Sequence, residues 1–145
     1  MVFDVEKWHP KLIGKNYKII ESDTNISEYN CVAFVLDIFD EWCGPTTSSW
    51  PWEKLSRSRK LDNYIKYFNM YGYEQCDEDY FEKDYDKIAI YIDENNGVNH
   101  VAKQFGNMWR SKLGPSCILE HELDWISGND FNNYGQIGAI IKKKK

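Results

Sequence analysis

The spacing of apolar and polar positions changes along the chain from helical to strand-like. Residues 31–42 carry apolar side chains on nearly every helical face and end before Gly44-Pro45. This pattern predicts a helix that is buried on most sides and therefore central. Residues 55–72 hold a second helical stripe, and Gly72 is a natural C-terminal cap. The first 24 residues show poor periodicity and predict an extended or partly helical lead-in.

After Gly72 the period becomes two residues, which is typical of strands. The turn signal at 93–97 (DENNG) and the pair Gly106-Asn107 separate the central strands. The expected strands cover residues 87–93, 98–105, 108–114 and 134–142, with a short extended piece at 73–76. Residues 117–126 are expected to form a short helix. The order of two helices followed by an antiparallel sheet predicts an α+β fold in one domain, residues 1–145.

Charge and hydropathy exclude some function classes. The net charge is −5 and the pI about 5.2, which argues against nucleic acid as a partner. The chain contains no run of the ~18–20 apolar residues that a membrane span needs and no signal peptide, so we expect a cytoplasmic protein without a membrane partner. The acidic run at 77–86 and the lysine run at 142–145 are expected to be solvated, although the acidic run offers a surface for a basic partner.

The four cysteines are expected to be reduced thiols. They are Cys31, Cys43, Cys76 and Cys117. Without a secretory signal, disulfides are not expected. Their spacing contains no C-x-x-C pair, and the nearest zinc-like set joins Cys117 and His121 to two distant cysteines. We therefore predict no metal and no cofactor.

Cys31 lies at a position that favours a nucleophilic cysteine. It falls at the first turn of the predicted central helix, where free main-chain N–H groups stabilise a thiolate and an oxyanion. A cysteine nucleophile needs a nearby base. Of the three histidines, His100 lies on the strand 98–105 with small neighbours, whereas His9 lies in the lead-in and His121 is expected at the surface or behind the site.

The turn at Gly106-Asn107 sets the expected neighbours of His100. A two-residue turn pairs Gln104 with Trp109 and Ala102 with Ser111, which places Trp109 and Ser111 on the face of His100. Ser111 then becomes the group that orients the imidazole, and Trp109 shields it. A longer turn shifts the register by one residue and presents Lys112 instead.

Several motifs together suggest a family. The order of Cys31 at a helix start, His100 on a strand and a polar residue on the next strand resembles the papain-like superfamily of cysteine peptidases and amidases, including NlpC-type enzymes. The strings YNCVAF, WPW, GYEQC, KIAIY, HVAKQ, WRSKLG and YGQI are similar to a family of small uncharacterised bacterial proteins with the patterns N-C-x-A, H-x-A-x-Q and W-x-S-K-L-G. This resemblance spans residues 29 to about 137.

The papain-like resemblance implies roles for individual residues. Cys31 becomes the nucleophile, His100 the general base and Ser111 the third position, where the superfamily usually has Asn, Asp or His. The amide six residues before the cysteine corresponds to Asn25, and Asn30 competes with it as an oxyanion or substrate contact. The implied fold is a central N-terminal helix packed on an antiparallel sheet.

Two classes of function follow. The first is a thiol hydrolase, a peptidase or amidase in which Cys31 attacks an amide or related acyl carbon of a peptide or other amide-containing substrate. The second is a catalytically inactive binding, immunity or regulatory module that uses the same fold to contact a protein partner. A thiol redox role is disfavoured because no resolving cysteine lies near Cys31 in the sequence.

Overall fold

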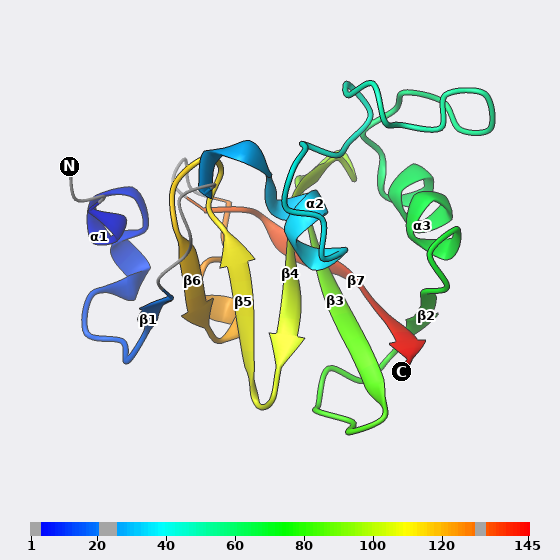
Figure 1. Ribbon diagram of the computed structural model, residues 1–145. Helices are drawn as coiled ribbons and strands as arrows, with labels where there is room; N and C mark the ends of the chain where they lie inside the picture. The colour runs from blue at the N-terminus through cyan, green and yellow to red at the C-terminus, as the bar shows by residue number, and fades with distance from the viewer. Residues whose placement is uncertain (1–3, 21–25, 130–132) are drawn as a thin grey trace.

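In the described part of the chain, seven antiparallel strands form one sheet, and both hydrophobic cores pack against it. The computed structural model describes residues 4–20, 26–129 and 133–145, and the sheet has the order β1-β6-β5-β4-β3-β7-β2 (Figure 1). The strands are β1 (Lys18–Ile20), β2 (Glu74–Cys76), β3 (Tyr85–Ile92), β4 (Val98–Phe105), β5 (Met108–Lys112), β6 (Ile118–His121) and β7 (Gln136–Lys144). The helices are α1 (Val5–Trp8), α2 (Cys31–Val35) and α3 (Leu61–Asn69), with 3-10 turns at Pro10–Leu12, Ile26–Glu28 and Leu123–Trp125. The α+β prediction is confirmed.

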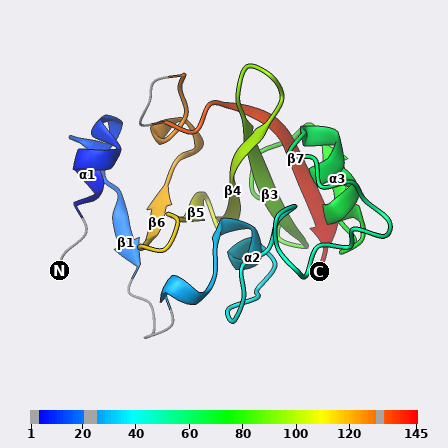
Figure 2. The same ribbon diagram turned by 90° about the horizontal axis from the view of Figure 1, so that it is seen from above.

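The sheet separates two hydrophobic cores. The first core lies under α2 and α3 and contains Phe68, Ile88 and Val101. The second core lies on the other face, where the N-terminal segment and the β6–β7 connection cover Tyr91 and Leu119. Figure 2 shows α2 on one side of the sheet and the β6–β7 connection on the other. The central strands are therefore buried on both faces.

The helix that begins at Cys31 is much shorter than predicted. It ends at Val35, and Asp37 adopts a left-handed conformation with φ of 59°. The Ile38 N–H donates to Ala33 O at 2.9 Å and the Asp37 N–H to Phe34 O at 3.1 Å, which is the Schellman arrangement. An aspartate rather than a glycine holds the left-handed position, so the sequence carries no obvious stop signal before Gly44.

The predicted hairpin between β4 and β5 has the predicted register. Gln104 pairs with Trp109 and Phe105 with Met108, as the two-residue turn requires. The regular pairing ends at Lys103 and Arg110, so Ser111 has no partner in β4. Residues 98–105 match the predicted strand in full.

The prediction of a short helix at residues 117–126 is wrong. Residues Ile118–His121 form β6, which lies between β1 and β5. Ile118 packs in the first core and Leu119 in the second. A strand buried on both faces reads as a continuous apolar run, and periodicity alone cannot tell such a run from a helix segment.

Most side chains of the two charged runs are exposed, as expected, but each run also makes specific contacts. Lys87, fully buried on β3, donates to Glu78 O at 2.9 Å and to Tyr80 O at 2.8 Å, and its Nζ lies 2.8 Å from a Glu82 carboxylate oxygen. The lysine run continues β7 as far as Lys144, and Lys142 Nζ lies 3.5 Å from the same Glu82 carboxylate. The acidic loop thus folds around the buried Lys87, and most of the lysine run is the end of a strand.

None of the helices in the described part of the chain has the length and apolar character needed to cross a bilayer.

Replacing Lys87 with Met is expected to lower the free energy of unfolding by about 2–4 kcal/mol, because two main-chain carbonyl groups and a carboxylate lose their fully buried partner. Urea denaturation measures the change. The matched control is Lys83→Met, an exposed lysine of the same loop, which should change stability by less than about 0.5 kcal/mol. Equal effects of the two variants would contradict the assigned role of Lys87.

Candidate functional site

Cys31 is the first residue of α2 and packs against the first core. The residue is partly exposed, but burial around the sulfur raises the pKa of the thiol. The N–H of Val101 and the positive charge of Lys112 act in the opposite direction and do not cancel the rise. The thiol is therefore protonated at neutral pH, which is the reverse of what a nucleophile requires.

Asn30 serves as the cap of α2. Its Oδ1 accepts hydrogen bonds from the N–H groups of Ala33 at 3.1 Å and Cys43 at 3.0 Å, and its Nδ2 donates to Cys43 O at 2.7 Å. These bonds join the start of α2 to the loop that follows it. The side chain has a structural task that does not require a substrate. Asn25, the other predicted oxyanion contact, lies outside the described residues.

His100 lies on the second face of the sheet. Its ring stacks on Tyr134 with centroids 4.1 Å apart and planes 10° apart, and it also contacts Tyr91. Burial lowers the pKa of His100 well below its usual value, with a smaller contribution from His121. Its Nε2 has no hydrogen-bond partner within the described part of the chain, so the imidazole is neutral and enclosed among aromatic rings.

Ser111 is bound to His121 and not to His100. The Ser111 hydroxyl lies 2.6 Å from His121 Nε2, and His121 Nδ1 lies 2.8 Å from Glu122 O. Because a carbonyl can only accept, Nδ1 carries the proton and Nε2 accepts from the serine. Both residues are fully buried, and burial lowers the pKa of His121 to about 4. Of the two expected positions of His121, at the surface or behind the site, the surface position is wrong, because the residue is buried opposite Trp109.

The sulfur of Cys31 lies by the N–H of Val101, and His100 is the residue before Val101 in β4. In β4, Val101 belongs to the first core and Ala102 to the second, so His100 projects away from α2, on the same side as Ala102. No hydrogen bond joins Cys31 to His100 among the described residues. Trp109 does share the face of His100, as predicted, but it lines a separate pocket with Asp79 and Asp124.

Lys112 is the residue of the motif that reaches the Cys31 side. It is fully buried, and its Nζ donates to Tyr29 O at 3.0 Å and to Gly114 O at 2.6 Å. The ammonium also lies over the Tyr29 ring, 4.7 Å from the centroid. Burial lowers the pKa of Lys112, against the opposing effect of nearby cysteines. Lys112 therefore joins the YNC segment to the W-x-S-K-L-G strand.

A pocket of about 260 Å³ opens at the start of α2. Its apolar wall includes Trp42, Pro45 and the buried ring of Tyr64, and the hydroxyl residues Thr46 and Thr47 also line it. Asn30, the neighbour of Cys31, lies at its edge.

Two arginines, Arg57 and Arg59, border the same pocket. Arg59 is engaged elsewhere: its Nη2 lies 2.9 Å from an Asp93 carboxylate oxygen. Arg57 donates to Pro45 O at 2.8 Å and to Thr47 O at 3.3 Å, and it forms no ion pair with the described residues. The Arg57 guanidinium is thus a cation without an ion-pair partner in the described part of the chain, at the rim of a mainly apolar pocket.

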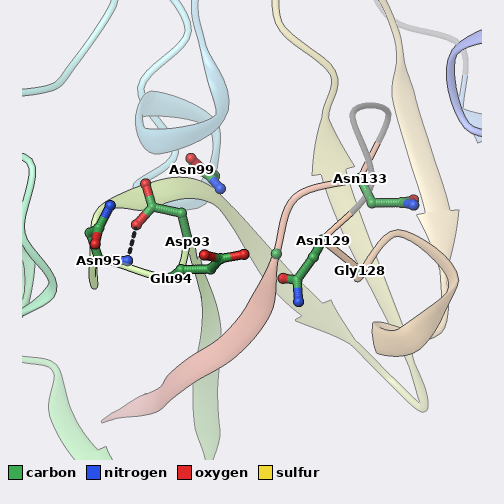
Figure 3. A pocket seen from close by; sticks show the side chains of 8 residues that line it. Asp93, Glu94, Asn95, Asn99, Gly128, Asn129 and Asn133 are labelled. Carbon is green, nitrogen blue, oxygen red and sulfur yellow. Dashed lines mark hydrogen bonds between the residues drawn. The ribbon is translucent and has the colours of Figure 1, made fainter.

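A second pocket, of about 270 Å³, lies between the β3–β4 turn and the β6–β7 connection (Figure 3). Asp93 accepts the N–H groups of Asn95 and Gly97 on one oxygen and contacts Arg59 through the other. In Figure 3 Glu94 points across the opening toward Asn129. Much of this polar lining already shapes the turn, so the pocket offers few groups to a ligand.

A zinc-like site does not form in the described ranges. No three His, Cys, Asp or Glu side chains within residues 4–20, 26–129 and 133–145 are grouped so that they could hold a metal ion.

The two buried histidines make stability depend on pH. Their pKa values are lowered in the folded chain, so the unfolded chain binds more protons below pH ~6.5. The contribution of the two histidines to the free energy of unfolding is therefore fully present above pH ~6.5 and is lost as the pH falls toward 4. The loss for each histidine is at most about 1.4 kcal/mol per pH unit. We expect His100→Phe, which can keep the stack on Tyr134, to reduce this slope in urea titrations at pH 5–7. An unchanged slope would contradict a neutral His100.

Comparison with known proteins identifies a family but no activity. No curated protein and no solved structure matches the chain. A family model described as a domain of unknown function, DUF7689, matches residues 19–142, which include α2, α3 and most of the sheet. The chain belongs to this DUF7689 family.

Proposed function

We propose that this domain is a non-catalytic recognition module on a papain-like scaffold. The scaffold part of the proposal rests on the order of elements: a helix that begins at a cysteine packs on an antiparallel sheet whose next strands carry a histidine and a polar residue. The recognition part rests on two observations: burial raises the pKa of the Cys31 thiol, and the His100 ring stacks on Tyr134 with no hydrogen bond to Cys31 among the described residues. A thiol with a raised pKa and no hydrogen-bonded imidazole lacks the pair that a thiol hydrolase requires.

The ligand site in this proposal is the pocket beside Asn30. An apolar cavity with a few polar groups at defined positions is the usual form of a small ligand site, and 260 Å³ accommodates one side chain or a chain end. Arg57 is the residue that selects a negatively charged ligand, because its guanidinium has no carboxylate partner in the described structure. We propose that the pocket takes an apolar group next to a carboxylate, such as the C-terminal residue of a peptide from a protein partner.

Alkylation by iodoacetamide separates this proposal from a thiol hydrolase. Each cysteine is followed by mass spectrometry from pH 5 to 10 in wild type and in His100→Phe. We expect Cys31 to react only as pH rises above the free-thiol pKa near 8.5, with the same profile in the variant. Fast alkylation of Cys31 below pH ~7 that is lost in His100→Phe would establish a thiolate–imidazolium pair and overturn the non-catalytic assignment.

Calorimetric titration tests the ligand. N-acetylphenylalanine is expected to bind at least fivefold more tightly than N-acetylphenylalaninamide, since only the acid offers a carboxylate to Arg57. Arg57→Gln should abolish this difference. Lys54→Gln, which removes an exposed charge from the same loop outside the pocket, should leave it unchanged. Equal affinity of the wild type for the acid and the amide would contradict the proposal that the pocket recognises a carboxylate.

A further inference from the structure

The Tyr64 side chain offers the pocket beside Asn30 a polar group that the described chain does not use. Tyr64 belongs to α3 and is 6% exposed, and it lines the pocket together with Gly44 of the loop that joins α2 to α3 (Figure 1). Its ring packs against the rings of Trp50 and Phe68, with centroid distances of 5.7 Å and 6.4 Å. These contacts fix the position of the ring and therefore of its hydroxyl.

The hydroxyl lies at the pocket end of this buried ring. A Cβ atom on Gly44 would be 3.7 Å from the Tyr64 oxygen. Arg59, another residue of the pocket lining, is close enough for its charge to act on the hydroxyl. Two lining residues therefore adjoin the oxygen, so the hydroxyl is the part of Tyr64 that faces the pocket.

The Tyr64 hydroxyl forms no hydrogen bond with the described residues. The fully enclosed polar atoms that lack a partner in the described chain belong to other residues, so the Tyr64 oxygen keeps an opening into the pocket. The hydroxyl of a buried tyrosine usually has a hydrogen-bond partner. Here only solvent or a ligand can supply one, so a ligand with a matching group gains affinity.

The protonation of Tyr64 restricts which group matches. Burial raises the pKa of Tyr64 above its usual value, and the positive charge of Arg59 does not cancel the rise. The hydroxyl is therefore neutral at physiological pH and can both donate and accept a hydrogen bond. A hydroxyl on the ligand matches both roles, whereas a hydrocarbon group matches neither.

We propose that Tyr64 determines the specificity of this pocket and that the ligand is a peptide whose C-terminal residue is tyrosine. This inference rests on the function proposed above. The ligand's ring meets the apolar wall at Trp42 and Pro45, its phenol hydroxyl bonds to the Tyr64 hydroxyl, and its terminal carboxylate stays at the rim with Arg57. A C-terminal phenylalanine fills the same space but leaves the Tyr64 hydroxyl without a partner, which lowers its affinity.

Calorimetric titration of the full chain with four probes tests the inference. The probes are N-acetyltyrosine, N-acetylphenylalanine and the primary amides of both, so the ring hydroxyl and the carboxylate vary independently. We expect the wild type to bind N-acetyltyrosine at least fivefold more tightly than N-acetylphenylalanine, because one hydrogen bond is gained. The same ratio is expected between the two amides, since Tyr64 contacts the ring hydroxyl and Arg57 the carboxylate.

Three variants assign each contact to one residue. Tyr64→Phe keeps the ring and loses only its oxygen, so it should fold and bind the tyrosine and phenylalanine probes equally, while its preference for acid over amide remains. Arg57→Gln should lose the preference for acid and keep the preference for tyrosine. Tyr80→Phe, which removes the hydroxyl of a tyrosine that is 62% exposed outside the pocket, should keep both preferences.

The results distinguish failure of this inference from failure of the proposed function. Equal wild-type affinity for the tyrosine and phenylalanine probes, with acid still preferred over amide, overturns the inference alone and requires no variant. A preference for tyrosine that persists in Tyr64→Phe overturns the role of Tyr64. Equal affinity for acids and amides, with tyrosine still preferred, supports the contact with Tyr64 and overturns the carboxylate site. Absence of binding by all four probes overturns both proposals.

Discussion

Burial of the central strands on both faces is the constraint on which the rest of this structure depends. Successive side chains of β4 must alternate between two cores, so Val101 supports the helices while Ala102 supports the N-terminal segment. The helical layer and the β6–β7 connection then lie on opposite sides of one sheet (Figure 2). Outside the bulge at Asn99, the side chains of two adjacent residues in β4 therefore point to opposite faces of the sheet.

Polar side chains on these strands fix the loops that cross the ends of the sheet. Lys87 and Lys112 are fully buried, and each donates to two main-chain oxygens of neighbouring segments. His121 and Tyr91 each donate to one main-chain oxygen of the turn after β6, those of Glu122 and Leu123. Since a buried donor without an acceptor costs about 1–3 kcal/mol, each of these contacts specifies one loop position. Lys112 of the W-x-S-K-L-G motif is thus explained by its contacts with the loops.

The sequence predicts the strands well where turn chemistry defines them. The bounds of β4, the start of β5 and the register of their hairpin follow from the two-residue turn at Gly106 and from alternation. The predictions are wrong where burial is symmetrical or a stop signal is unusual. The run at 117–126 has no alternation to read, because β6 is buried on both faces. The end of α2 depends on Asp37 in a conformation that favours glycine.

The candidate site shows that the order of residues in the sequence does not determine which side chains face one another. Alternation correctly places His100, Ala102 and Trp109 on one face, but it does not say which face a helix covers. A β-bulge adds to this uncertainty: Tyr91 pairs with His100, whereas Ile92 pairs with Val98, so Asn99 is the extra residue. Strict alternation would place Val98 with His100, yet Val98 and Val101 share the first core. The strand thus supplies apolar residues to the first core at both positions and directs the imidazole to the opposite face, where it contacts Tyr91 and Tyr134.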